Sequence, residues 1–230
     1  MKVYGNCIRF LRCCARGAAG WRSEEPPVSG PAVYLVHHQN LYGPFHVLAF
    51  YPKELRPWIY SPFCGRKECF DQYYRYTFTK RFGMPKPIGF AAAGICSVVI
   101  PALMRDYRAI PVYRDGRRIR ETMSLSQQAL ERGESLLICP DVDYSNSQEE
   151  TGKIYQGFLR LEKDYFKRTG QHLAFVPMAC AKKGRKILFG APVYFEDSPL
   201  FKQQQDAVAK RLIEGMNTVG KRAEAFKAKR

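Results

Sequence analysis

The sequence predicts an α/β fold, a single domain in which a mixed, mostly parallel sheet carries helices on both faces. Short segments rich in branched and aromatic residues recur along the chain and are apolar at successive positions. This pattern is typical of strands that are buried on both faces. Segments with apolar residues at helical spacing separate them. A length of 230 residues suits one such domain with a short appendage.

Residues 1–30 are expected to form a basic helix and a linker that precede an α/β domain of residues 31–230. The helix, residues 2–22, has apolar side chains on one face and arginines around them. Those arginines interrupt the apolar run, so the segment does not resemble a secretory signal. Residues 24–31, rich in Pro, Ser and Gly, form the linker.

The domain is expected to contain six strands, each of strand length: Ala32–Val36, 109–113, 135–139, 173–176, Lys186–Phe189 and 193–195. Residues 124–132 are predicted to be a helix that ends at Gly133, and residues 154–168 a helix that ends before Gly170. An amphipathic C-terminal helix is predicted from about Gln203, followed by a basic tail.

Residues 88–104 contain no charged side chain, and three interpretations are open. The segment is slightly shorter than the roughly 20 residues that a membrane span needs. It is therefore expected to be a buried core helix, a segment that dips into one leaflet of a membrane, or a transmembrane helix.

Composition favours an anionic partner. The chain has 37 Lys and Arg against 21 Asp and Glu, a net charge of +16, which suits an anionic membrane surface, nucleic acid or phosphorylated ligands. No helix-turn-helix, zinc-finger or RNA-binding pattern accompanies the charge, so no nucleic acid is expected. The apolar and charged fractions exclude a wholly disordered, collagen-like or coiled-coil chain.

The eight cysteines lack zinc-site spacing and are expected to be buried thiols, with no metal bound.

Chemically useful side chains follow three of the predicted strands. His37 and His38 follow the first, Arg114 the second, and Asp141 with Asp143 the third. Ligands of open α/β sheets bind at the carboxyl ends of the strands. A base, a cation and carboxylates are therefore expected to converge on one edge of the sheet.

Three segments of the chain together resemble blocks of the glycerophospholipid acyltransferase family, of the lysophosphatidic acid acyltransferase type. They are VHHQNLYGPF, AIPVYRDGR and ALERGESLLICPDVDYS. In them His38 matches the family's histidine, Arg114 its phosphate-binding arginine, and Pro140, Asp141 and Ser145 positions of its Phe-Pro-Glu-Gly-Thr-Arg-Ser block. The resemblance runs from about Ala32 to Phe195.

The resemblance implies an O-acyltransferase of phospholipid biosynthesis. A general base would take a proton from a hydroxyl of a lysophospholipid such as 1-acyl-glycerol-3-phosphate, and the oxygen would attack an acyl thioester. The donor would be acyl-CoA or acyl carrier protein, with no further cofactor. His38 would be the base, while Arg114, Pro140, Asp141 and Ser145 would bind substrate. The protein would be cytoplasmic and peripherally bound to the inner face of a membrane.

Gly43 occupies the position of the family's orienting aspartate and is a departure from it. Asp141 or Asp143 is expected to supply a carboxylate instead, and Asp143 is the favoured replacement. His37 is expected to point away, because adjacent residues of a strand face opposite sides. The alternative is a catalytically weak or inactive relative that binds lipid at the membrane surface.

Overall fold

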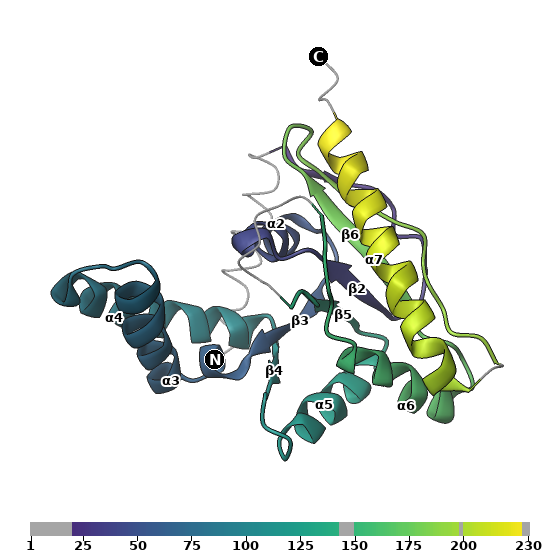
Figure 1. The fold of residues 1–230 in the computed structure, drawn as a ribbon, viewed down its shortest axis with the longest axis horizontal. Helices are drawn as coiled ribbons and strands as arrows, with labels where there is room; N and C mark the ends of the chain where they lie inside the picture. Colours follow the sequence, from purple (N-terminus) through teal and green to yellow (C-terminus); the bar gives the residue numbers. More distant parts are fainter. Residues whose placement is uncertain (1–19, 143–149, 198–199, 227–230) are drawn as a thin grey trace. The chain divides into compact units, whose positions relative to one another are not determined.

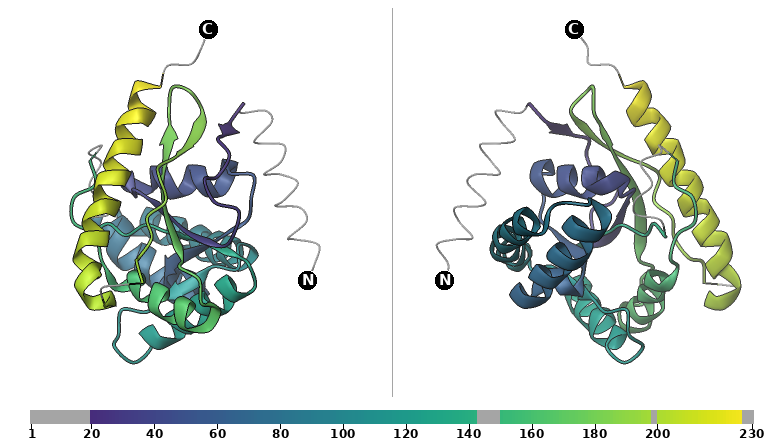
Figure 2. Two further views of the ribbon diagram at one scale, coloured as in Figure 1. Left: turned by 90° about the vertical axis from the view of Figure 1, so that its right-hand side faces the viewer. Right: turned by 60° about the vertical axis from the view of Figure 1, so that its left-hand side comes forward.

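The computed structural model describes residues 20–142, 150–197 and 200–226 (Figures 1 and 2). The chain divides into two compact units, one of Met1–Leu55 with Ser126–Arg230 and the other of Arg56–Leu125. The described strands make a mixed, mostly parallel sheet, and helices accompany it. The predicted α/β fold class is therefore confirmed.

The first unit contains the central strands. In spatial order they are β1 (Arg22–Ser23), β7 (Lys186–Phe189), β6 (Ala174–Ala181), β2 (Ala32–Val36) and β5 (Ser135–Ile138). Only the pairing between β6 and β7 is antiparallel among these neighbours. The carboxyl ends of β2, β5 and β6 consequently lie at one edge, which we call the carboxyl edge.

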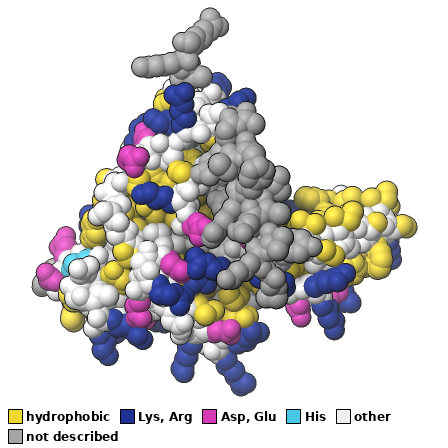
Figure 3. All heavy atoms as spheres, turned by 180° about the vertical axis from the view of Figure 1, so that it is seen from behind, with side chains coloured by type: hydrophobic (Ala, Val, Ile, Leu, Met, Phe, Trp, Pro, Cys, Tyr) yellow, Lys and Arg dark blue, Asp and Glu magenta, His cyan; other side chains and the backbone are white. Residues whose placement is uncertain are grey.

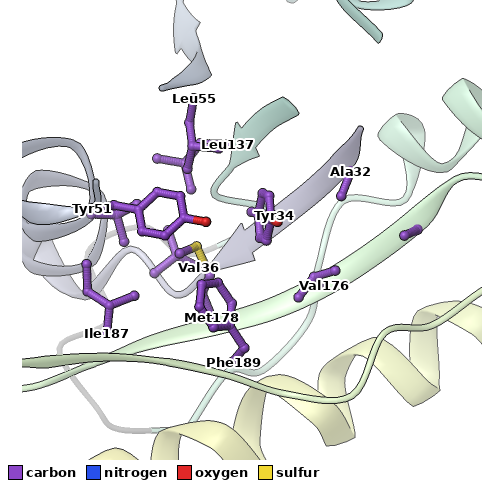
Figure 4. Packing of buried hydrophobic residues seen from close by; sticks show 12 residues of the cluster. Ala32, Tyr34, Val36, Tyr51, Leu55, Leu137, Val176, Met178, Ile187 and Phe189 are labelled. Carbon is purple, nitrogen blue, oxygen red and sulfur yellow. The ribbon is translucent and has the colours of Figure 1, made fainter. Parts of the chain in front are cut away.

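Alternation along β2 and β6 sends side chains to two apolar layers. On one face, Tyr34 of β2 packs with Val176 and Met178 of β6 and with Tyr51, which follows α2 (Tyr42–Phe50) (Figure 4). On the other face, α7 (Phe201–Ala225) runs alongside β6, as Figure 2 shows. Helices therefore cover both faces of this sheet, as predicted.

The other described helices connect these strands or build the second unit. They are α5 (Ile119–Glu131), α6 (Arg160–Thr169), α3 (Arg66–Asp71), α4 (Lys86–Asp106), the π-helix η3 (Gln72–Arg81), and the short 3₁₀ helices η1 (Gln39–Leu41), η2 (Ser61–Cys64) and η4 (Gly157–Leu159). In the second unit, β3 (Leu55–Tyr60) pairs in parallel with β4 (Ile110–Val112).

Several predicted elements need correction. Residues 193–195 form a single bridge, between Val193 and Phe175, next to the part of β6 that pairs with β7. The helix predicted over 154–168 begins at Arg160, after a bridge at Ile154 and η4. The predicted N-terminal helix falls mostly on residues 1–19, outside the described residues, but Arg22 lies in β1.

The apolar segment 88–104 lies within α4 and is not a buried core helix. In the described part of the chain, α4 is the one helix long and apolar enough to cross a membrane, and 22% of its most apolar window is buried. Several of its large side chains, among them Ile95 and Val98, are instead exposed. Two of the three sequence-based interpretations therefore remain, shallow insertion and a transmembrane span.

Candidate functional site

The candidate site lies where β2 and β5 end side by side. The two strands are parallel neighbours, and Leu35 pairs with Ile138. His37 and His38 follow β2, and Asp141 comes three residues after Ile138. The expected convergence of bases and carboxylates at the carboxyl edge is thus confirmed for these three residues.

Asp141 joins the two histidines through both of its carboxylate oxygens. Its Oδ1 lies 2.6 Å from His37 Nδ1, and its Oδ2 accepts a hydrogen bond of 2.9 Å from the backbone N–H of His38. The side chains of His37 and Asp141 are 11% and 4% exposed. A nearly buried carboxylate beside Nδ1 favours the tautomer that carries its proton there, which leaves the lone pair of a neutral His37 on Nε2.

The backbone around Asp141 is fixed by hydrogen bonds to residues 153–155. Residue 141 forms an antiparallel bridge with Ile154, and Tyr155 N–H donates to the carbonyl of Pro140 at 2.8 Å. Val142 N–H donates to the Lys153 carbonyl at 3.1 Å. These bonds fix the backbone of Asp141, and the His38 N–H and His37 ring fix its carboxylate. Pro140, predicted to bind substrate, contributes a backbone acceptor to this bridge.

His38 does not contact the Asp141 carboxylate through its ring; it caps the short helix η1 instead. β2 ends at Val36, and His38 adopts helical dihedral angles (φ −67°, ψ −43°) as the N-cap of η1. Its Nδ1 accepts a hydrogen bond of 3.2 Å from the backbone N–H of Leu41. A neutral His38 that accepts at Nδ1 carries its proton on Nε2, so Nε2 has no lone pair to act as a base.

The prediction that His37 points away from the carboxylate is wrong. Alternation of side chains applies only within an extended strand, and the chain leaves that conformation after Val36. His37 therefore contacts Asp141 even though it is adjacent to His38. Two adjacent histidines just after a strand were the available signal, but the point at which the strand ends decides which one meets the carboxylate.

Gly43 is required by close packing against the same segment. A Cβ atom at this position would overlap the carbonyl oxygen of His37 and lie 3.0 Å from Val36 Cγ2. An aspartate cannot be placed here without moving the backbone of His37. Close packing therefore excludes a side chain at position 43, and the carboxylate that contacts His37 lies at the end of the neighbouring strand.

The thiols and phenol near this edge are protonated at neutral pH. Burial, helped by the charge of Asp141, raises the pKa of Cys139 well above its ordinary range. Burial also raises the pKa of Cys180 to about 12, and its Sγ donates to the Gly43 carbonyl at 3.9 Å. Burial raises the pKa of Tyr42 to about 12 as well. These groups do not supply a thiolate or phenolate nucleophile.

The structure gives no contact between the remaining predicted residues and Asp141 within the described ranges. Arg114 belongs to the second unit, where its guanidinium lies 4.7 Å from the centroid of the Tyr60 ring. Asp143 and Ser145 lie outside the described residues. Within the described ranges, no group of three or more His, Cys, Asp or Glu side chains is arranged to hold a metal ion.

Comparison of the chain with family models, curated proteins and solved structures gave no match.

Proposed function

We propose that the protein is an O-acyltransferase that moves an acyl group from a thioester to a hydroxyl of a lysophospholipid, with His37 as the general base. The observation that carries the proposal is the 2.6 Å contact between His37 Nδ1 and the nearly buried Asp141 carboxylate at the carboxyl edge of the sheet. The resemblance to the acyltransferase blocks supplies the substrate class. The sequence alone favours His38 as the base, and the proposal assigns this role to His37 instead.

The proposed step needs a base with a fixed lone pair. His37 Nε2 takes the proton of the acceptor hydroxyl while the oxygen attacks the thioester carbonyl carbon. The tetrahedral intermediate then collapses, the C–S bond breaks, and the thiolate leaves with a proton from the imidazolium. Asp141 stabilises the imidazolium that forms in between and keeps the ring in one orientation.

The donor would be acyl-CoA or acyl carrier protein, and the acceptor 1-acyl-glycerol-3-phosphate or a similar lysophospholipid. An acceptor with a phosphate agrees with the net charge of +16, as does peripheral binding to an anionic membrane at the cytoplasmic face. Arg114, with its planar fork of donors, is the proposed phosphate ligand. Asp143 and Ser145 remain proposed members of the site.

Release of thiol from acyl-CoA tests the proposal. Purified protein with acyl-CoA and lysophosphatidic acid should release thiol and form phosphatidic acid in equal amounts, and omission of the acceptor should stop the release. His37→Gln keeps a donor towards Asp141 but removes the base, so it should lower turnover by about 10²–10⁴-fold.

A wild-type protein that releases no thiol across several donors and acceptors would contradict the proposal. The alternative, an inactive relative that binds lipid at the membrane surface, would then be favoured if the same preparation still bound lysophospholipid.

A further inference from the structure

Helix α4 of the second unit has its apolar residues distributed in an unusual way. Five of its large apolar side chains are exposed, while Ile100, Leu103 and Met104 are half-buried; the exposed ones are Ile88, Phe90, Ile95, Val98 and Val99. Its buried residues are small or lack a long side chain and repeat every four positions: Gly89, Ala93, Ser97 and Pro101. A helix in a water-soluble core shows the reverse pattern, with large apolar residues inside.

The buried stripe of α4 lets neighbouring helices approach closely. Gly89 lies against η3, where a Cβ atom would be 3.5 Å from Phe78 Cβ and 3.6 Å from Thr79 Oγ1. Further along, Cys69 of α3 donates from Sγ to the Cys96 carbonyl at 3.8 Å. Helices in membranes pack through small residues in this way, because their large apolar residues face lipid.

The same neighbours exclude a simple membrane span. α3 and η3 pack along α4 and carry exposed charged residues, including Arg75, whose side chain is 78% exposed and pairs with Asp71 at 3.2 Å. If α4 crossed the bilayer, these charges would enter the hydrocarbon, where they are costly. One side of α4 can enter lipid while the side held by α3 and η3 stays in the interface.

Basic residues lie near both ends of α4, and aromatic residues lie beside it. Lys80, Arg81 and Lys86 are exposed near its start, and Arg105 and Arg108 near its end. η3 adds aromatic rings, among them Tyr74, whose centroid lies 5.6 Å from that of Phe90. Figure 3 shows hydrophobic side chains gathered over this unit, with Lys and Arg and a few Asp or Glu side chains along one edge. Rings and basic groups of this kind anchor proteins at the lipid headgroups.

We propose that the α3–η3–α4 layer is a monotopic membrane-binding surface, in which the exposed side of α4 enters the acyl-chain region of one leaflet. The occupant of this apolar face is an anionic lipid bilayer. The exposed apolar side chains match the hydrocarbon of such a surface, and the basic residues near both ends of α4 match its headgroups. The inference is independent of the acyl-transfer chemistry at His37.

Flotation with neutral phosphatidylcholine vesicles in about 1 M NaCl isolates the apolar contribution, because salt screens the basic residues. Ile95 is 68% exposed, so Ile95→Gln should fold normally and lower vesicle binding by about tenfold. Leu200, in the first unit and 76% exposed, provides the matched control, and Leu200→Gln should bind as wild type does.

Depth of insertion provides a second measurement. The fluorescence of Ile95→Trp, corrected for the two native tryptophans, should be quenched by lipids brominated on the acyl chain, whereas Leu200→Trp should not be quenched. Equal vesicle binding of Ile95→Gln and Leu200→Gln, or an unquenched tryptophan at position 95, would overturn the proposal.

A second copy of the chain is the other occupant that the experiment can reveal. Light scattering should give the same mass for wild type and Ile95→Gln without vesicles. If wild type were a dimer that Ile95→Gln dissociates, with vesicle binding unchanged, the face would be an interface between chains and the membrane proposal would be wrong.

Discussion

The carboxylate of Asp141 accepts two hydrogen bonds at once, and both come from the segment that follows β2. One donor is the ring of His37 and the other is the backbone N–H of His38. The backbone bond fixes Oδ2 as an acceptor, so Oδ1 is the oxygen left for the His37 ring. Because each oxygen has its own donor, Asp141 can fix the orientation of the His37 ring. Gly43 has no side chain with which to do so.

Asp141→Asn tests whether the carboxylate sets the tautomer of His37. The backbone N–H of His38 requires the amide oxygen, so the amide NH₂ would face His37 Nδ1 and force its proton to Nε2. We expect kcat to fall by about 10²–10⁴-fold with the fold intact. Asp164→Asn, at an exposed position of α6, is the control and should leave kcat unchanged. Similar kcat values for the two variants would remove Asp141 from the mechanism.

Gly43 leads to a second prediction at this scale. Gly43→Ala should lower the free energy of unfolding by about 1–3 kcal/mol in urea titrations, because the added Cβ displaces the His37 carbonyl. Gly43→Asp, which introduces the aspartate found at this position in the acyltransferase blocks that the sequence resembles, should lower activity rather than raise it. Gly30→Ala, where a Cβ meets nothing within 4 Å, is the control. A Gly43→Asp variant with higher acyl-transfer activity than wild type would contradict the steric explanation.

At the scale of elements, the sequence predicted the strands better than the site. β2 and β7 have the predicted bounds, because each is a compact apolar run between polar or Gly/Pro-containing segments. α2 and β3 were not predicted, since Pro44 and Pro57 break their patterns. The π-helix η3 has no signal at the helical period of 3.6 residues.

The site was only partly predictable because it depends on local backbone geometry. Convergence at the carboxyl edge follows from strand order, and the sequence indicated the strands involved. The pairing of Asp141 with His37 rather than His38 depends on where β2 ends and on the helical turn at His38. A strand boundary that is wrong by one residue reverses the assignment.

A similar arrangement at the start of β6 holds α6 in place. The buried Glu162 contacts His172 Nδ1 at 2.6 Å through Oε1 and accepts from Leu173 N–H at 2.8 Å through Oε2. Asp197 lies 3.3 Å from His172 Nε2. Burial alone would lower the pKa of His172, but hydrogen bonds and charges of Glu162 and Asp197 outweigh it and raise the pKa.

The raised pKa of His172 predicts a pH-dependent stability. The stability that charged His172 contributes is fully present below its pKa in the unfolded chain, about 6.5. This contribution is lost as pH rises through the pKa of His172 in the folded protein. His172→Gln should therefore cost more free energy of unfolding at about pH 5.5 than at about pH 8.5. Asp197→Asn should show a smaller dependence, since that side chain is exposed. An equal cost of His172→Gln at both pH values would contradict the assignment.

At the scale of the whole molecule, the net charge of +16 predicts membrane binding that depends on lipid charge. In low salt, vesicles containing anionic lipid should recover more protein than neutral vesicles. At about 1 M NaCl, this difference should disappear, because the Debye length shrinks to about 3 Å. Flotation with both vesicle types measures it. Equal recovery with the two types in low salt would rule out the electrostatic contribution.

Comparison of the two adjacent histidines in one assay tests most directly whether His37 is the general base. His37→Gln and His38→Gln have the same chemical change, and glutamine can replace both the donor to Asp141 and the acceptor for Leu41 N–H. Acceptor-dependent thiol release should fall by about 10²–10⁴-fold in His37→Gln and by less than about tenfold in His38→Gln. The reverse order, with His38→Gln inactive and His37→Gln close to wild type, would contradict the assignment of His37 as the base.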